Sequence, residues 1–111
     1  MIVEERIYTL VPGKTAEYLK NYEELGLPVQ LPILGNLIGY FATEIGPLNQ
    51  IIHIWGYDSF EERTRRRMEL FKSEAWLAYL AKNRGNIVSQ ENKLLTPAPF
   101  SPVGGSRPAK Q

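Results

Sequence analysis

The chain has 111 residues and a net charge of +1, with 43% hydrophobic and 23% charged residues. This length allows one domain with a single core, and so small a net charge gives no electrostatic reason to expect nucleic acid or a membrane surface as a partner. The absence of cysteine excludes disulfides and thiolate ligands, and one histidine with scattered carboxylates makes a metal site improbable.

The first residues, MIVEERIY, predict a strand over Ile2–Leu10. Its alternation places Glu4, Arg6 and Tyr8 on one face, and the opposite face, with Val3 and Ile7, is the one we expect helices to cover. The two early glutamates are unlike a signal peptide, and no run approaches the roughly 18 apolar residues of a membrane span. We therefore expect a cytoplasmic protein with no membrane partner.

A helix is predicted next, over residues 15–25, because apolar positions recur at helical spacing. Gly26 is placed where a helix commonly ends in a left-handed conformation. Residues 27–34 are apolar but contain Pro28 and Pro32, so this segment cannot be a central strand. It is either a short second helix with Pro28 in its first turn or a buried irregular connector.

The stretch GYFATEIGPLNQIIHIWGY, residues 39–57, predicts two strands joined by a turn at residues 46–49. The strands run over about 37–45 and 50–57. On the second strand Ile52 and Ile54 take one face, which we interpret as core, and the histidine takes the other. That other face combines aromatic bodies with polar tips and carries His53, Trp55 and Tyr57.

Ser59 and Glu62 form the pattern of a capping box and predict the start of a helix. We expect this helix to break at Ser73, a second N-cap, and to continue to a stop at Gly85. A last strand is predicted over residues 86–95. The expected inward stripe of the first of these helices is Phe60, Thr64, Met68 and Phe71.

The element order strand, helix, strand, strand, helix, strand predicts an α+β ferredoxin-like βαββαβ fold with a four-stranded antiparallel sheet. We expect one domain over residues 1–96 and a proline- and glycine-rich extended tail over residues 97–111. Both helical regions should cover one face of the sheet. The other face, expected to hold the tyrosine and tryptophan bodies, then needs a second copy of the sheet as its cover.

The chain resembles the NIPSNAP family of the dimeric α+β barrel superfamily. The residues that carry the resemblance are GYFATEIGPLNQIIHIWGYDSFEERTRRR, residues 39–67, then Glu74, Ala75 and Trp76, and IVSQENKLL, residues 87–95. The resemblance implies a homodimer of ferredoxin-like protomers. It implies no reaction and no cofactor.

Candidate ligand-binding residues follow from the aromatic faces and from an arginine-rich helix. An imidazole acts as acid or base near neutral pH, and aromatic rings stack on flat ligands. The same residues could instead fill the core or a dimer interface. The candidates are His53, Trp55, Tyr57, Tyr40, Arg63 and Arg67.

The arginine run over residues 63–67 is flanked by glutamates at helical spacing, which favours a salt-bridged, solvated helix face over an anion or RNA site. Arg63 and Arg67 lack such partners and could reach a carboxylate ligand. An inward Arg6–Glu44 pair is one option for the buried charges of the strands.

Two functions remain open from the sequence. One is a homodimeric small-molecule binder or cofactor-independent enzyme with a pocket at His53, Trp55 and Tyr57. The other is a non-catalytic structural or interaction dimer. A hollow between helices and sheet would favour the first function, and a packed interior would favour the second.

Overall fold

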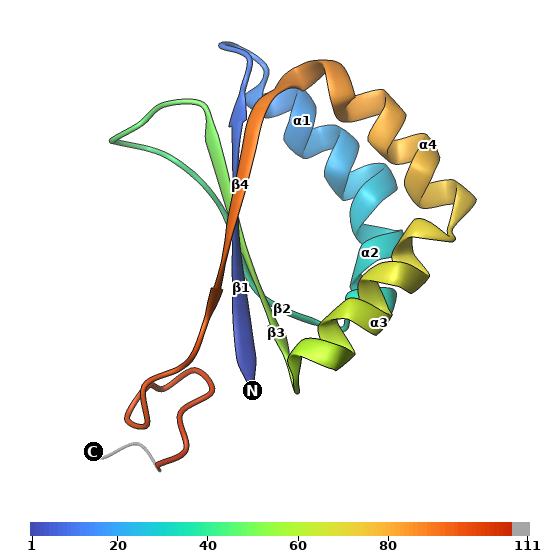
Figure 1. The fold of residues 1–111 in the computed structure, drawn as a ribbon. Coiled ribbons are helices and arrows are strands. Elements are labelled where there is room, and N and C mark those ends of the chain that lie inside the picture. Colours follow the sequence, from blue (N-terminus) through green and yellow to red (C-terminus); the bar gives the residue numbers. More distant parts are fainter. Residues whose placement is uncertain (108–111) are drawn as a thin grey trace.

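The computed structural model describes residues 1–107 of the chain. Four strands and two helical regions alternate in the predicted order (Figure 1). The elements are β1 (Ile2–Leu10), α1 (Thr15–Asn21), the π-helix η1 (Tyr22–Gly26), α2 (Leu27–Leu34), β2 (Asn36–Ala42), β3 (Gln50–Tyr57), α3 (Phe60–Phe71), α4 (Glu74–Asn83), the 3-10 helix η2 (Arg84–Asn86) and β4 (Ile87–Leu95).

The strands form one antiparallel sheet in the order β2-β3-β1-β4, and all helices lie on one side of it (Figure 1). This arrangement confirms the α+β ferredoxin-like fold. The two halves meet through the central pair β1 and β3, where Arg6 lies opposite His53 and Glu4 opposite Trp55. Residues paired in this way point to the same face of a sheet, so the register decides which side chains meet.

The faces of β1 and β3 are the reverse of the prediction. Tyr8 packs edge-on against Tyr18 of α1, and Glu4 pairs with Arg63 of α3, so this face of β1 lies under the helices. His53, Trp55 and Tyr57 share that face, and Ile52 and Ile54 lie on the open side. Alternation separates two faces but does not say which one the helices cover, because a buried carboxylate with partners on another element looks like a surface residue in sequence.

The first helical region is continuous from Thr15 to Leu34, which confirms the helical interpretation of residues 27–34 and corrects the expected stop at Gly26. The helix ends at Gly35, whose φ of 93° lies in the left-handed region that glycine adopts readily. Gly26 has another role. A Cβ there would lie 2.8 Å from the ring of Tyr22 and 2.9 Å from that of Tyr79, so the missing side chain lets α4 approach.

The prediction for the inward side of α3 is also wrong. Phe60, Met68 and Phe71 are about half exposed, and Leu70 is fully buried. The inward side carries arginines instead, and Arg66 donates to the carbonyl of Ile33 at the end of α2. The reason is the buried Glu4 on the sheet beneath, which attracts cations to the side of α3 that apolar residues would otherwise occupy.

Both serine caps are confirmed. Ser59 accepts a hydrogen bond from the backbone of Glu62, and Ser73 accepts one from that of Trp76. The carboxylate of Glu62 does not complete the reciprocal capping box but pairs with Arg65 and Arg66. The expected salt bridges of the arginine run are therefore confirmed for Arg65 and Arg66, and Arg63 instead pairs with the buried Glu4.

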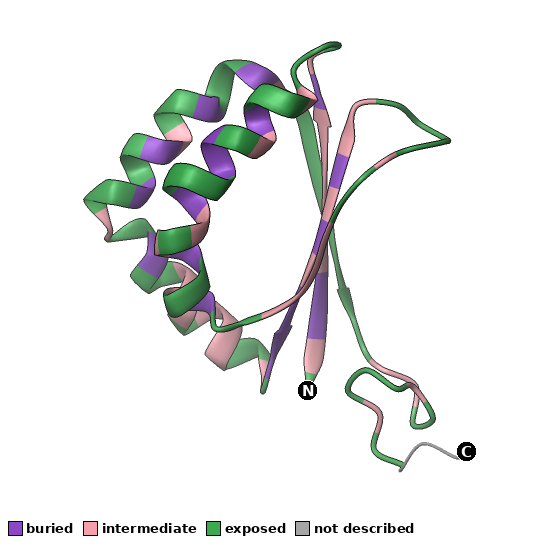
Figure 2. Cartoon of the chain, turned by 180° about the vertical axis from the view of Figure 1, so that it is seen from behind, coloured by how far each residue is buried: buried purple, intermediate pink, exposed green. Residues whose placement is uncertain are grey.

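Buried residues gather where the helices meet the sheet, and the chain beyond β4 is mostly exposed (Figure 2). Residues 96–107 contain no helix or strand, as predicted, but they are not extended. Backbone hydrogen bonds from Ser101 to Ala98 and from Arg107 to Pro99 fold this segment into successive turns. Residues 108–111 of the expected tail lie outside the described part of the chain.

Candidate functional site

A cleft of about 590 Å³ opens between the helices and the edge of the sheet at β4. Its walls come from β1, α2, α3, α4, η2 and β4, so distant parts of the sequence meet there. A volume of several hundred Å³ is typical of small-molecule sites. The lining residues are Arg6, Tyr8, Gln30, Arg67, Phe71, Trp76, Leu80, Arg84, Ile87, Val88, Ser89 and Gln90.

A small recess of about 30 Å³ adjoins the cleft on its inner side. This volume is enough for a water molecule or for one polar group of a ligand. Six residues line the recess but not the cleft: His53, Tyr40, Tyr18, Tyr22, Tyr79 and Asn83. The cleft and the recess share the residues Tyr8, Gln30, Trp76, Leu80, Ile87 and Gln90.

His53 is 1% exposed and lines this recess. Its ring stacks on Tyr40 at a centroid distance of 4.7 Å and meets Tyr8 edge-on at 4.9 Å. Burial lowers the pKa of His53 to about 3, and the charges of Arg6 and Arg67 act in the same direction. The imidazole is therefore neutral at pH 7.

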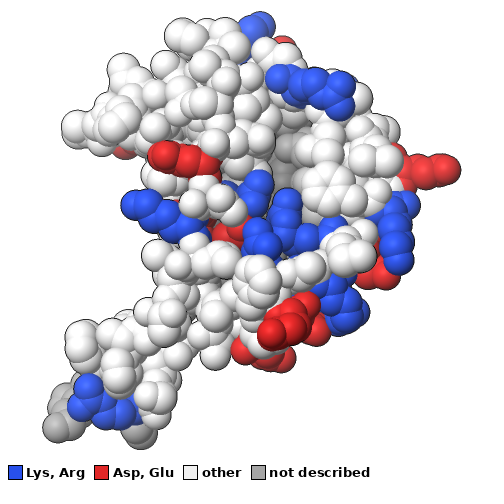
Figure 3. Space-filling view, in the orientation of Figure 1, with Lys and Arg blue, Asp and Glu red and all other residues white. Residues whose placement is uncertain are grey.

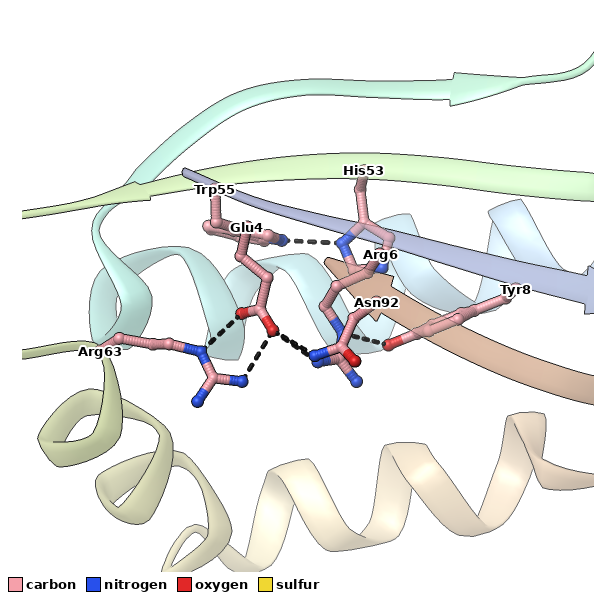
Figure 4. A network of polar contacts seen from close by, with 7 residues as sticks. All are labelled: Glu4, Arg6, Tyr8, His53, Trp55, Arg63 and Asn92. Carbon is pink, nitrogen blue, oxygen red and sulfur yellow. Dashed lines mark hydrogen bonds and ion pairs between the residues drawn. The ribbon is translucent and has the colours of Figure 1, made fainter. Parts of the chain in front are cut away.

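Trp55 determines which nitrogen of His53 carries the proton. The indole Nε1–H donates to Nδ1 of His53 at 2.7 Å (Figure 4). Because a neutral imidazole has one donor and one acceptor nitrogen, the proton sits on Nε2. Nε2 finds no hydrogen-bond partner within residues 1–107. A residue that lines the recess thus has a buried N–H donor without an acceptor in the described chain.

Trp76 of α4 provides a second donor of this kind. It is 6% exposed, lines both the cleft and the recess, and its Nε1 has no partner among the described residues. Unsatisfied buried donors are uncommon and destabilising, so two at one cavity indicate a place for an acceptor atom.

Glu4 forms the centre of a polar network beneath α3 (Figure 4). Its carboxylate is fully buried and accepts two hydrogen bonds from Arg63, at 3.1 and 2.7 Å, one from Arg6 at 3.1 Å and one from Asn92 at 2.7 Å. Burial alone would raise the pKa of Glu4, but the hydrogen bonds from Arg63 and Asn92 and the charge of Arg6 lower it to about 2. Two arginines therefore share one negative charge.

The two candidate arginines of α3 have different surroundings. Arg63 is held by Glu4 and does not line the cleft. Arg67 lines the cleft, lies over the ring of Phe71 at 5.7 Å, and has no ion pair or hydrogen bond within the described chain. Burial and the neighbouring charge of Arg6 lower the pKa of Arg67.

The remaining candidate residues lie at different places in the structure. Tyr40 joins His53 at the recess, where its hydroxyl lies 3.1 Å from that of Tyr18. Trp55 is fully buried, donates a hydrogen bond to His53 and lines neither the cleft nor the recess. Tyr57 lies at a different hollow of about 130 Å³, beside Asn36 and Arg66. The suggested Arg6–Glu44 pair is wrong, since Arg6 pairs with Glu4 and Glu44 is exposed.

Several lining residues were not predicted. Trp76, Gln30 and Gln90 lie on three elements, and no spacing within the sequence connects them. Arg6 and Tyr8 carried a usable signal, because they share a face with Glu4 on a strand that otherwise looked apolar. That signal indicates a buried polar network, but the helix that completes it is visible only in the fold.

The fold and the cleft together define a ferredoxin-like α+β protein with a ligand-sized cavity between its sheet and its helices. The profile of the NIPSNAP family matches residues 3–102, and the chain belongs to that family. Among curated relatives, a NipSnap homologue of Dictyostelium discoideum is 36% identical over 94 residues, and human NipSnap homologue 3A is 35% identical over 100 residues. These matches span 85% and 87% of this chain but 41% and 39% of those relatives.

Solved structures agree with this assignment. A NIPSNAP family protein from Agrobacterium tumefaciens is 52% identical with a TM-score of 0.90, covering 92% of this chain and 97% of that one. A NIPSNAP-like domain protein from Burkholderia xenovorans is 49% identical with a TM-score of 0.89, covering 91% and 88%. A putative antibiotic biosynthesis monooxygenase from Nitrosomonas europaea has a TM-score of 0.65 at 7% identity, covering 87% and 98%, which shows a shared fold alone.

None of the helices in residues 1–107 has the length and apolar character needed to cross a bilayer. No group of three or more metal-binding side chains comes together in that part of the chain.

Proposed function

We propose that the protein is a homodimeric small-molecule-binding protein that takes its ligand in the cleft between helices and sheet. The observation that carries this proposal is that His53, a residue lining the recess, has a buried Nε2–H with no acceptor in the described chain. A cavity kept open beside an unpaired donor is costly unless something binds there. The packed interior expected of a purely structural dimer offers no reason for either feature.

The recess is too small for a whole ligand, so the ligand body occupies the larger cleft and inserts one acceptor atom. A carbonyl or other uncharged oxygen accepts from Nε2 of His53, with Nε1 of Trp76 as a second donor. Tyr40 and Tyr8 hold the imidazole in place, and Trp55 fixes its tautomer.

If the protein is also a cofactor-independent enzyme, His53 acts as a hydrogen-bond donor to a developing oxyanion. It is not suited to act as a general base, because Nδ1 is occupied by the hydrogen bond from Trp55, Nε2 already carries the proton and the pKa of the ring is about 3. The proposal therefore concerns binding first and limits any catalysis to polarisation of the bound oxygen.

The test is a thermal-shift screen of a small-molecule library, followed by calorimetry on two variants. In His53→Gln the amide nitrogen replaces Nε2, and in His53→Asn the amide oxygen replaces Nδ1 as the acceptor for Trp55. We expect His53→Gln to keep binding and His53→Asn to weaken it by at least tenfold. A library without any hit, or equal binding by both variants, would contradict the proposal and favour the structural dimer.

The homodimer is proposed to form through the open face of the sheet. This face carries Phe41, which is 55% exposed, and the apolar residues Ile7, Ile52 and Ile54, which helices do not cover. An apolar sheet face of this kind is commonly buried against another sheet. The interface is thus the aliphatic side of the sheet and not the aromatic side.

A further inference from the structure

We propose that the ligand of the cleft is a flat organic carboxylate whose carboxylate group pairs with the guanidinium of Arg67. This inference rests on the small-molecule function proposed above and names the chemical class of the ligand. It is carried by the charges that line the cleft and by the way in which the chain uses its other arginines.

The cleft lining is cationic. Arg6, Arg67 and Arg84 are among its residues, and no aspartate or glutamate is. Figure 3 shows blue side chains gathered in the hollow between sheet and helices. Glu4 lies beside this hollow, but its single charge is shared by Arg6 and Arg63. The surroundings of the cleft therefore carry a net positive charge, which favours an anion over a neutral or cationic ligand.

Arg67 is the guanidinium of the cleft wall that is available to pair. Arg6 already donates to Glu4 and to the hydroxyl of Tyr8 at 2.9 Å. Arg84 is exposed at the rim. Arg67 is partly buried, lies over the ring of Phe71 and has no ion pair or side-chain hydrogen bond within residues 1–107. A partly buried charge without a partner is unfavourable, and an incoming anion removes that cost.

The shape and charge of the Arg67 guanidinium favour a carboxylate. A guanidinium offers two parallel N–H groups, which match the two oxygens of a carboxylate. Arg63 and Glu4 show this pairing within the same protein. A phosphate monoester carries a second charge. Arg6 is already paired with Glu4 and Arg84 is exposed, so Arg67 would leave that second charge without a buried cationic partner.

The apolar residues of the cleft wall indicate the shape and polarity of the rest of the ligand. Phe71, Trp76, Leu80 and Ile87 give the cleft aromatic and aliphatic sides. Such a surface stacks well on a flat ring system. The ligand is therefore a carboxylate on a planar apolar body, with the carboxylate at α3 and the body against α4.

The test uses four naphthalene probes of the same body: 2-naphthoate, 2-naphthamide, 2-naphthylamine and 2-naphthyl phosphate. Calorimetry at low ionic strength measures the affinity of each. We expect 2-naphthoate to bind at least tenfold more tightly than the other three and to lose affinity as salt is added.

Arg67→Gln and Arg65→Gln form the matched pair of variants. Both remove one positive charge from α3, but the side chain of Arg65 is 61% exposed and does not line the cleft. We expect Arg67→Gln to weaken the binding of 2-naphthoate by at least tenfold. Arg65→Gln should leave the affinity within twofold of the wild-type value. Circular dichroism checks that both variants fold.

Tighter binding of the amide, the amine or the phosphate, or an equal effect of the two variants, would overturn the carboxylate assignment and leave the small-molecule function standing. Binding of none of the four probes would overturn the assignment as well. The proposed function would fall with it only if the library screen also gave no hit, so the two failures are distinguishable.

Discussion

At the scale of single residues, His53 links the site to the stability of the fold. Its pKa falls from an ordinary value of 6.5 to about 3 on folding because it is buried. Below pH 6.5 the unfolded chain therefore binds a proton that the folded chain does not. This contribution to stability is complete above pH 6.5 and is lost progressively as the pH falls toward 3.

We predict that the free energy of unfolding falls by about 2 kcal/mol between pH 7 and pH 5, since each pH unit below 6.5 costs about 1.4 kcal/mol for one such group. Urea unfolding at several pH values measures it. In His53→Asn the slope over this range should be nearly flat. An equal slope in the variant and the wild type would show that His53 is not the group responsible.

Glu4 is the second residue whose role depends on burial. We predict that Glu4→Gln lowers the free energy of unfolding by about 3 to 5 kcal/mol, because it leaves Arg6 and Arg63 without their shared carboxylate. Chemical denaturation at pH 7 provides the measurement.

Glu24→Gln is the control for this change. Glu24 lies in the first helical region, is exposed and has no ion pair within residues 1–107. Its substitution should alter stability by less than about 0.5 kcal/mol. Similar effects of the two substitutions would contradict the buried network.

At the scale of elements, the contact between the first helical region and α4 depends on Gly26. Alanine usually stabilises a helix relative to glycine. Here we predict the opposite, a loss of about 1 to 3 kcal/mol for Gly26→Ala, because the new Cβ meets the rings of Tyr22 and Tyr79 at less than 3 Å. Thermal denaturation followed by circular dichroism measures the change.

Gly85→Ala is the matched control, since a Cβ at Gly85 meets no atom within 4 Å. It should be neutral or slightly stabilising. If Gly26→Ala were equally harmless, the close approach of α4 would not be a constraint on the fold.

The elements also show where sequence reasoning succeeds. Ser59 and Ser73 predicted both helix starts, because a cap is a contact between residues three positions apart. Gly26 misled the prediction of a helix end, since its reason is a contact with Tyr79 on a helix more than fifty positions away. Local chemistry can be inferred from the sequence, and a close approach of distant helices cannot.

At the scale of the whole molecule, the open face of the sheet decides the assembly. We predict that light scattering at micromolar concentration gives twice the chain mass of 12.7 kDa. Phe41→Glu should yield a folded monomer, because Phe41 is 55% exposed in the protomer and lies on the open face.

Phe60→Glu introduces the same charge on the exposed side of α3, where the phenyl ring is 52% exposed, and should leave the dimer intact. A wild-type protein that runs as a clean monomer would refute the proposed assembly. Dissociation by Phe60→Glu alone would move the interface to α3.

The boundary between a domain over residues 1–96 and a separate tail remains a proposal. We predict that deletion of residues 104–111 changes the melting temperature by no more than a degree or two, because the segment beyond β4 is mostly exposed. Differential scanning calorimetry measures it. A loss of ten degrees would show that the turns beyond β4, which bring Gly104 next to Met1, are part of the core.

The sequence by itself determined the element order, both serine caps and the ferredoxin-like topology, because periodicity and capping are local properties and few topologies connect such an order. It also identified His53, Tyr40 and Arg67 as candidates. The tertiary structure decided which face of the sheet lies under the helices, and with it the role of each residue. Glu4 draws Arg63 inward, Trp55 sets the proton on His53, and Trp76 arrives from α4. The contact of Glu4 with Arg63 and the approach of Trp76 to the recess join elements far apart in the chain, so no spacing within the sequence could have predicted them. Trp55 and His53 are two positions apart on β3, and the fold decided only that both lie under the helices.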